Sequence, residues 1–260
     1  DNGSPSGISN IVSSSGVVAS DVSAVGTARS GLMAVSYNYD KVVMMYGENG
    51  SGYASISNLI SNSGVVAADT TSIAGTARSY GAGVSYGSSG LGLNSSGTVS
   101  ADATGVGTAR RGLGATKYGT GLALFAFGQV SGTVNTRNLV STSGVIASDV
   151  SGVGTARAGV EAAGYDGDKG LFCYGGQTST RNKVSNTGVV NSDQSGAGTA
   201  RTDTAASEYG GDKAIFGFGY SNQYLGVTNL VNTGGVIGSD VSAVGTARKN
   251  PGAAGFSFSA

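Results

Sequence analysis

The chain has 260 residues, a formal net charge of zero at pH 7 and only 12% charged residues. That balance argues against nucleic-acid binding, which needs a basic stripe to displace counterions, and against a polybasic membrane surface. No apolar run approaches the ~18 residues of a transmembrane helix, so we expect no membrane insertion.

One phrase occurs six times along the chain. It reads GVVASDVSAVGTAR at 16–29 and GVIASDVSGVGTAR at 144–157, and every copy ends in GTAR. A period in the forties is typical of two-helix HEAT-type repeats or of four-stranded propeller blades. The copies are 44–49 residues apart, with one interval of 32, and they end at Arg29, Arg78, Arg110, Arg157, Arg201 and Arg248.

The amino-acid composition favours four-stranded propeller blades over two-helix repeats. Glycine accounts for 47 residues, and glycine and β-branched residues are poor helix formers, whereas short alternating runs bounded by Gly and Asn indicate strands. The sequence predicts four strands per repeat. They are a first strand after each GTAR (31–38, 158–165), a more apolar second strand (41–47, 121–128, 170–176, 214–219), a third strand (58–64, 138–144, 182–188, 229–235) and a fourth in the GVVASD element (16–21).

These elements predict one all-β domain over residues 1–260, a six-bladed β-propeller of roughly 47-residue repeats. The last blade is shared with residues 1–25, and pairing of the N- and C-terminal segments is expected to close the ring without an open edge. The 75–106 unit and the shared unit are expected to lack a full second strand. The alternative is a fragment of a longer open array. The repeats start near Gly26, Gly75, Gly107, Gly154, Gly198 and Gly245.

The repeat resembles the kelch class of propeller. Kelch blades have an Arg-containing lead-in, an apolar strand ending in a glycine pair and a later aromatic, and GTAR followed by YDGDKGLFCYGG (165–176) is similar to that layout. The kelch tryptophan is absent, and only Gly175–Gly176 keeps the pair. The sequence of the repeat also resembles Gly/Ser-rich propeller repeats in structural proteins of marine bacteriophages. These resemblances imply a kelch-like fold and a virion component.

Each copy of the phrase also carries an aspartate eight or nine residues before its arginine. A charge that recurs once per blade lies on a ring, and arginine presents a planar fork that fits a carboxylate. We expect the Asp that ends one blade to pair with the Arg that opens the next; an anion-binding ring is the alternative. This structural Asp–Arg ladder comprises Asp21, Arg29, Asp69, Arg78, Asp102, Arg110, Asp149, Arg157, Asp193, Arg201, Asp240 and Arg248.

The chain lacks most of the side chains on which enzymes rely. It has no histidine, the commonest general base and metal ligand, and we expect its one cysteine, Cys173, to be a buried free thiol. We therefore predict no enzyme, no catalytic residue, no cofactor and no metal site. Glu161, Glu208 and Asp203 leave open a carboxylate pair of the glycosidase kind. The acidic segment 165–170 offers oxygen ligands for calcium, although a hairpin turn explains it better.

The predicted strands repeat from unit to unit, but the loops between the second and third strands differ in length and in sequence. Binding residues tend to lie on loops that a rigid scaffold holds. Tyrosine stacks on apolar faces, and Asn, Gln and Arg hydrogen-bond to hydroxyls or carboxylates. The ligand-binding candidates in these loops are Tyr53, Gln129, Arg137, Gln177, Arg181, Asn222, Gln223 and Tyr224.

We therefore expect a non-enzymatic binding or structural propeller in the virion or outside the cell. As a phage tail, fibre or capsid-surface component it would engage a host-surface glycan or another virion protein. The expected partners include neither nucleic acid nor membrane. A secreted or cell-surface propeller lectin or adhesin is the alternative.

Overall fold

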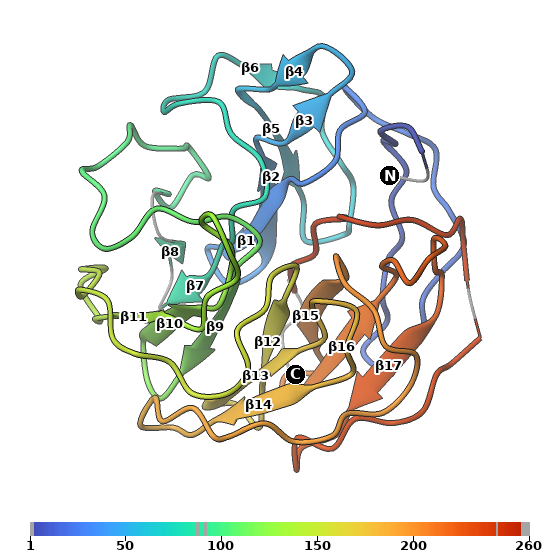
Figure 1. Ribbon diagram of the computed structural model, residues 1–260. Helices are drawn as coiled ribbons and strands as arrows, with labels where there is room; N and C mark the ends of the chain where they lie inside the picture. The colour runs from blue at the N-terminus through green and yellow to red at the C-terminus, as the bar shows by residue number, and fades with distance from the viewer. Residues whose placement is uncertain (1–2, 87–88, 91–92, 243, 256–260) are drawn as a thin grey trace.

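The computed structural model describes residues 3–86, 89–90, 93–242 and 244–255, and all regular structure in them is β (Figure 1). The first sheet has the antiparallel order β1 (Met33–Tyr37), β2 (Lys41–Met45), β5 (Ile56–Ile60) and β6 (Thr70–Thr71). Three further sheets have three strands each, with the second strand of the repeat in the middle.

The first of these sheets contains β9 (Gly114–Tyr118), β10 (Leu122–Ala126) and β11 (Arg137–Val140). The next contains β12 (Glu161–Tyr165), β13 (Lys169–Cys173) and β14 (Arg181–Val184). The last contains β15 (Ala205–Tyr209), β16 (Lys213–Gly217) and β17 (Thr228–Val231). Two short hairpins complete the set: β3 (Glu48–Asn49) with β4 (Gly52–Tyr53), and β7 (Ser85–Tyr86) with β8 (Ser89–Gly90).

The acidic segment 165–170 forms a hairpin turn between β12 and β13, as predicted. Asp166 and Gly167 both have positive φ, 53° and 73°, a conformation that Asp and Gly adopt readily in two-strand turns. Lys169 lies 2.8 Å from a carboxylate oxygen of Asp166 and 3.0 Å from one of Asp168. Both carboxylates therefore pair with a lysine of their own turn.

The core lies between neighbouring sheets. The ring of Phe127 stands edge-on to that of Phe172 with 5.4 Å between centroids, and Tyr174 stands edge-on to Phe216 at 5.7 Å. Such aromatic pairs contribute beyond the area they bury. Cys173 is buried and free, as predicted, and burial raises the pKa of its thiol to about 12.

The predicted six-bladed propeller of four-stranded blades is wrong. The described residues form separate small sheets, of which only the first has four strands, and no sheet among them is closed. Among the described residues of the 75–106 unit, the hairpin β7–β8 is the only pair of strands, and Leu93 and Val99 form an isolated bridge. Residues 8–22 make two isolated bridges, Ser9 to Val22 and Val12 to Val18. Strand pairing within the described part of the chain therefore does not join the two terminal segments.

The fourth element of the repeat does not become a regular strand because side chains occupy its backbone groups. The backbone of segment 144–150 pairs with β11 at two isolated bridges. The amide of Asn138 donates to the carbonyl of Ala147 at 3.1 Å and to the carboxylate of Asp149 at 2.8 Å. A side chain thus replaces a ladder bond at this carbonyl. The same bond recurs from Asn10, Asn58, Asn182 and Asn229.

Six backbone hydrogen bonds join the six units in a ring. In each unit the N–H two residues after the repeated arginine donates to the carbonyl at the same place in the preceding unit. All six residues have positive φ, between 52° and 65°. The bonds, 2.8–3.1 Å long, run from Gly31 to Asn250, Tyr80 to Gly31, Gly112 to Tyr80, Gly159 to Gly112, Asp203 to Gly159 and Asn250 to Asp203. The first strands β1, β9, β12 and β15 consequently lie nearest the middle of the molecule (Figure 1).

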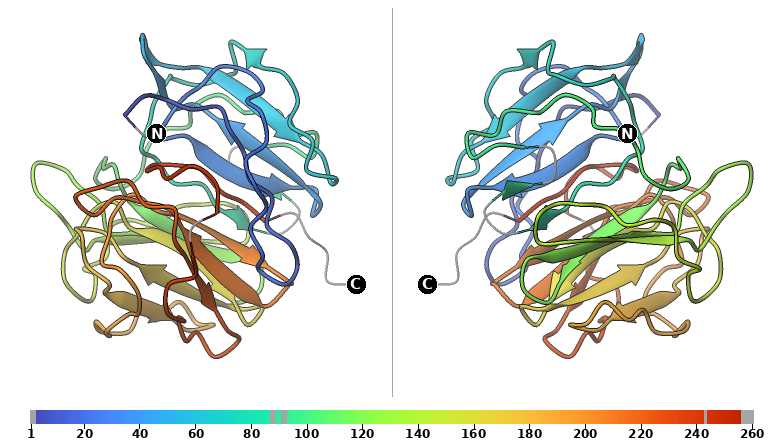
Figure 2. Two further views of the ribbon diagram at one scale, coloured as in Figure 1. Left: turned by 90° about the vertical axis from the view of Figure 1, so that its right-hand side faces the viewer. Right: turned by 90° about the vertical axis from the view of Figure 1, so that its left-hand side faces the viewer.

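Side chains connect the N-terminal part of the chain to its C-terminal part. Thr246 donates to Asp21 through its N–H at 2.9 Å and its hydroxyl at 2.6 Å. Arg248 lies 3.8 Å from Asp21 and donates to Asn10. The N-terminal chain, blue in Figure 2, crosses between the sheet of β1 and the sheet of β15. Polar side chains therefore link the two ends, alongside the apolar packing of Val12 and Val18 against the C-terminal part.

Candidate functional site

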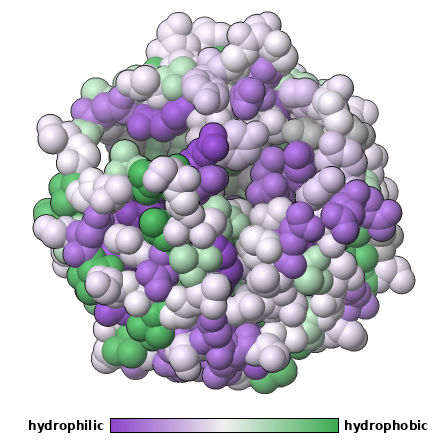
Figure 3. Space-filling view, in the orientation of Figure 1, coloured by the Kyte–Doolittle hydropathy of each residue, from purple (hydrophilic) through white to green (hydrophobic). Residues whose placement is uncertain are grey.

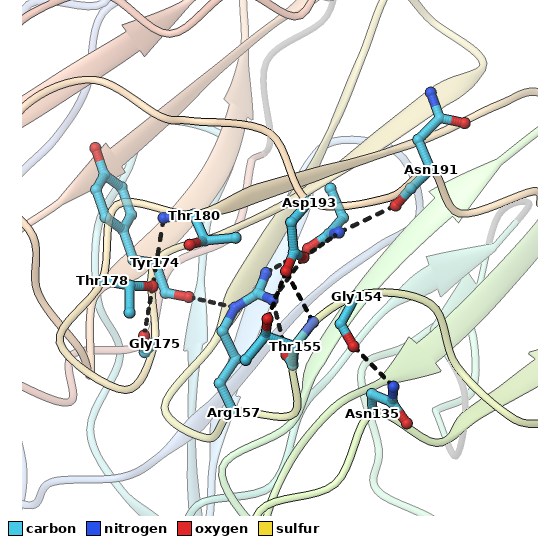
Figure 4. Close-up of polar contacts among 11 residues, drawn as sticks. Asn135, Gly154, Thr155, Arg157, Tyr174, Gly175, Thr178, Thr180, Asn191 and Asp193 are labelled. Atoms are coloured by element: carbon cyan, nitrogen blue, oxygen red, sulfur yellow. Dashed lines mark hydrogen bonds and ion pairs between the residues drawn. The ribbon is translucent and has the colours of Figure 1, made fainter.

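A polar cluster around the repeated arginine fixes each unit, and Figure 4 shows the cluster of Arg157. Its Nε donates to the carbonyl of Tyr174 at 2.8 Å and its Nη2 to Asn182 Oδ1 at 2.5 Å, while Nη1 lies 3.7 Å from Asp193 Oδ1. Asp193 Oδ2 accepts the N–H of Thr155 at 2.9 Å and its hydroxyl at 2.6 Å. Both carboxylate oxygens are thus bonded inside the unit.

Each arginine pairs with the aspartate of the following copy of the phrase. Arg110 lies 3.8 Å from Asp149, and Arg157 lies 3.7 Å from Asp193. The expected pairing of Asp149 with Arg157 is therefore wrong. The aspartate ends the unit that its partner arginine opens, so the pair ties together the two ends of one unit. The other pairs are Arg29–Asp69, Arg78–Asp102, Arg201–Asp240 and Arg248–Asp21.

The arginines also connect neighbouring units, through aromatic rings. Arg157 Cζ lies 4.2 Å from the ring centre of Phe127, which follows the second strand of the preceding unit. Cation–π contacts of this kind contribute about 1–2 kcal/mol when they are desolvated. Arg78, Arg201 and Arg248 lie in the same way over Tyr46, Tyr174 and Phe218, at 4.6, 3.9 and 3.8 Å.

The electrostatics of the cluster fit a structural role. Hydrogen bonds from Thr108 and then from Asn138 lower the pKa of Asp149. Burial lowers the pKa of Arg157, and the charge of Asp193 opposes that effect, but a guanidinium stays protonated in proteins. The carboxylate of Asp193, the amide of Asn182 and the ring of Phe127 already surround the guanidinium of Arg157. The cluster therefore acts as a rigid support for the loops.

The variable loops lie at the end of the molecule that carries the ring of hydrogen bonds. Their bases are bridged to the residues that follow the arginines, Gln129 to Arg111 and Tyr220 to Thr202. Tyr53 in β4 is 62% exposed. Figure 3 views this end, where hydrophilic residues gather in separate patches. Three further candidates are exposed here: Gln177, Asn222 and Gln223.

Two of the candidates are not loop residues. Arg137 and Arg181 open β11 and β14, where they stand opposite Ala126 and Cys173. Arg181 Nη1 donates to the carbonyl of Gly235 at 3.2 Å, and the Nε atoms of both arginines are buried. Their assignment to the variable loops is wrong because the third strand begins one residue earlier than the sequence pattern indicated.

One group of side chains at this end combines aromatic rings with a positive charge. Tyr220 and Tyr224 stand edge-to-face with 5.6 Å between centroids, and Lys249 Nζ lies 5.3 and 5.9 Å from the two ring centres. Both tyrosines are partly exposed. We call these three residues the tyrosine–lysine cluster. Sequence reasoning identified only Tyr224 among them.

Two carboxyl groups near this cluster have raised pKa values. Burial, and then the negative charge of Asp203, raise the pKa of Glu161 to about 8. Burial also raises the pKa of Asp203, against the positive charge of Lys249. Glu208 instead pairs with Lys117 at 2.6 Å. Of the carboxylates that the sequence left open, the structure therefore couples Glu161 with Asp203.

A cavity of about 500 Å³ lies along the first strands of the units. It is lined by parts of β1, β7, β9, β12 and β15 and by segment 253–255, and it includes the ion pair of Lys117 and Glu208. The first strands are rich in Gly, Ala and Ser, which are too small to fill the middle. Within the described ranges no cluster of three or more metal-ligating side chains occurs.

The repeat itself holds the signal that would have found Tyr80, Asp203 and Lys249. The two residues after GTAR differ in nearly every unit: Ser-Gly, Ser-Tyr, Arg-Gly, Ala-Gly, Thr-Asp and Lys-Asn. Variation directly after a constant phrase marks a place where the frame tolerates different side chains. The hydrogen-bond ring brings these variable pairs together.

Comparison with known proteins adds no family. No protein-family model matches the chain, and no curated protein matches its sequence. Over the part of the chain that the structure describes, no helix is long and apolar enough to cross a membrane.

Proposed function

We propose that this protein is a non-enzymatic binding or structural component of a virion, and that its loop end engages a host-surface glycan or another virion protein. The observation that carries this proposal is the tyrosine–lysine cluster, Tyr220, Tyr224 and Lys249, at an end with variable loops. Partly exposed tyrosines offer a flat apolar face with a polar tip, which suits binding surfaces.

The chemistry of the cluster favours an acidic ligand. A tyrosine ring stacks on the apolar face of a sugar, while the ammonium of Lys249 attracts a carboxylate or sulfate. Asn222 and Gln223, exposed between the two tyrosines, supply donors and acceptors for hydroxyl groups. We therefore expect glycans that carry acidic sugars to bind more tightly than neutral ones.

The frame supports binding because it holds the loops in place. The loop that carries Tyr224 is anchored at Tyr220 by bridges to Thr202 and to Tyr224 itself. Beneath it, Arg248 lies over Phe218 and pairs with Asp21. A surface that is ordered before binding loses less conformational entropy when a ligand arrives.

A glycan array probed with the intact protein tests the proposal. We expect selective binding to acidic glycans, which Tyr224→Ala abolishes. Tyr39→Ala is the matched control, because Tyr39 is 63% exposed in the β1–β2 turn at the opposite end. Equal loss in both variants contradicts a role for the cluster, and absence of binding to every glycan contradicts the glycan form of the proposal.

A further inference from the structure

The hairpin of β3 and β4 projects from the loop end of the first unit. Its strands pair at two positions, of which Asn49 with Gly52 is the one nearer the turn. Gly50 and Ser51 form the turn itself, and every residue from 50 to 53 is exposed. The backbone of this turn is therefore open to solvent and is held by few contacts.

The side-chain amide of Asn49 is folded back over the turn. Its Oδ1 accepts the N–H of Ser51 at 2.9 Å. The side-chain carbonyl carbon, Cγ, therefore lies beside the peptide nitrogen of Gly50, the residue between the two. The same hydrogen bond draws electrons from the carbonyl group and stabilises the negative charge that forms on Oδ1 when a nucleophile attacks Cγ.

The residue after Asn49 puts no side chain in the way of such an attack. Gly50 has no Cβ, and a Cβ at this position would meet nothing within 4 Å. Glycine also rotates through backbone conformations that other residues avoid, so the peptide nitrogen can turn toward Cγ. Asn2 also precedes a glycine, but it lies outside the described residues.

Two other turns have part of this arrangement. Asn232 Oδ1 accepts the N–H of Gly234 at 3.0 Å, but the next residue along the chain is a β-branched threonine. Asp166 precedes a glycine in a hairpin turn, but its side chain is a carboxylate paired with Lys169 at 2.8 Å, and a carboxylate is a poor electrophile. Of these three turns, the one at Asn49 alone combines the amide, the hydrogen bond and the glycine.

We propose that Asn49 is a site of spontaneous deamidation in which the protein's own backbone is the nucleophile. The nitrogen of Gly50 gives its proton to a base in the solvent and attacks Cγ of Asn49. The new N–Cγ bond closes a five-membered succinimide ring, and the Cγ–Nδ2 bond breaks, so that Nδ2 takes up a proton and leaves as ammonia. Water then opens the ring at either carbonyl and leaves aspartate or isoaspartate.

The modification changes the charge and the backbone of the hairpin. Either product carries a negative charge that Asn49 lacks, on a chain whose formal net charge is zero. In isoaspartate the main chain runs through the side-chain carbonyl and is one carbon atom longer. A two-residue turn sets the register of its strands, so the pairing of Asn49 with Gly52 is lost in that product.

The first test incubates the intact protein at mildly alkaline pH and follows each asparagine by peptide mapping. We expect the peptide of Asn49 to gain the mass difference between NH2 and OH and to split into two isomers on the column. The rate should rise with pH, because the attacking nitrogen must lose its proton. Asn232 should keep its amide in the same sample. An unchanged Asn49, or equal loss at Asn232, overturns the proposal.

The second test compares Gly50→Ala with the unaltered protein. The open space around Gly50 admits the extra carbon, so we expect an unchanged Tm. Release of ammonia from Asn49 should slow about tenfold or more, because alanine restricts the rotation that brings the nitrogen to Cγ. Asn49→Gln, whose ring would have six members, should also remain unmodified. If Gly50→Ala deamidates as fast as the unaltered protein, the backbone nitrogen is not the nucleophile and the proposal is wrong.

Discussion

The guanidinium of Arg157 lies between the ring of Phe127, 4.2 Å from its centre, and the carboxylate of Asp193, 3.7 Å away. The carboxylate belongs to its own unit and the ring to the preceding one. One side chain therefore fixes a unit internally and attaches it to its neighbour, although no strand passes between their sheets.

Phe127→Leu is expected to lower the free energy of unfolding by about 1–2 kcal/mol, because leucine keeps much of the apolar volume but offers no ring to Arg157. Urea denaturation measures the change. Phe125→Leu, at a partly exposed ring in β10, is the control and should cost less. Equal losses would assign the effect to packing alone.

Asp149→Ala is expected to lower Tm by more than Asp168→Ala. Asp149 accepts three hydrogen bonds, two from Thr108 and one from Asn138, and pairs with Arg110, whose side chain is 4% exposed. Its removal leaves a buried guanidinium without its carboxylate, which is strongly destabilising. Asp168 pairs with the partly exposed Lys169 and also accepts a hydrogen bond from Asn186, but such surface interactions contribute little. Calorimetry that finds the same Tm for both variants contradicts this account.

Glu161 is expected to make stability depend on pH. Its pKa is about 8 in the fold, through burial and then the charge of Asp203, against an ordinary value of 4.5. The folded state therefore keeps a proton that the unfolded chain releases, and the free energy of unfolding falls as pH rises from 4.5 to 8. A pKa difference of one corresponds to ~1.4 kcal/mol, so the loss between pH 5 and pH 8 is on the order of 2–4 kcal/mol.

Glu161→Gln checks this dependence, because glutamine stays neutral at every pH. We expect its denaturation midpoint to change much less between pH 5 and pH 8 than that of the unaltered protein. Glu208→Gln, which removes the carboxylate paired with Lys117, should leave the pH dependence in place. A Glu161→Gln profile parallel to that of the unaltered protein rules out this source of the effect.

Gly159→Ala is expected to destabilise the protein more than Gly167→Ala. Both glycines have positive φ, 65° and 73°, so alanine is strained at either by ~1–2 kcal/mol. A Cβ on Gly159 would lie 2.0 Å from Thr202 Oγ1 and 2.5 Å from Asp203 Oδ1, whereas one on Gly167 meets nothing within 4 Å. Equal melting temperatures would mean that the structure around Gly159 accommodates the added Cβ with no loss of stability.

The alternation of apolar residues predicted the first three strands of each complete unit. β2, β10, β13 and β16 begin within one residue of their expected starts and end two or three residues before their expected ends. The fourth strand was predicted from the same alternation. No regular fourth strand forms because the amide of Asn138, and the equivalent amides, donate to carbonyls of this segment. The hydrophobic pattern of the sequence does not reveal these side-chain hydrogen bonds. The partner of each aspartate was missed because sequence proximity favoured the wrong arginine.

No particular residue type in the sequence marks the hydrogen-bond ring, because backbone groups make it. Gly31, Tyr80, Asp203 and Asn250 take equivalent places in it. For a related reason, the sequence predicted only part of the tyrosine–lysine cluster. Tyr224 stood out as an aromatic residue in a variable loop, whereas Lys249 reaches it from the lead-in of the next unit.

An open array of repeats can melt from its ends, because a terminal unit has only one neighbour. The six backbone bonds from Gly31 round to Asn250 give every unit two neighbours. Removing any one unit therefore breaks two joints at once. Thermal unfolding should consequently be cooperative across all six units, with no fraying species populated before the main transition.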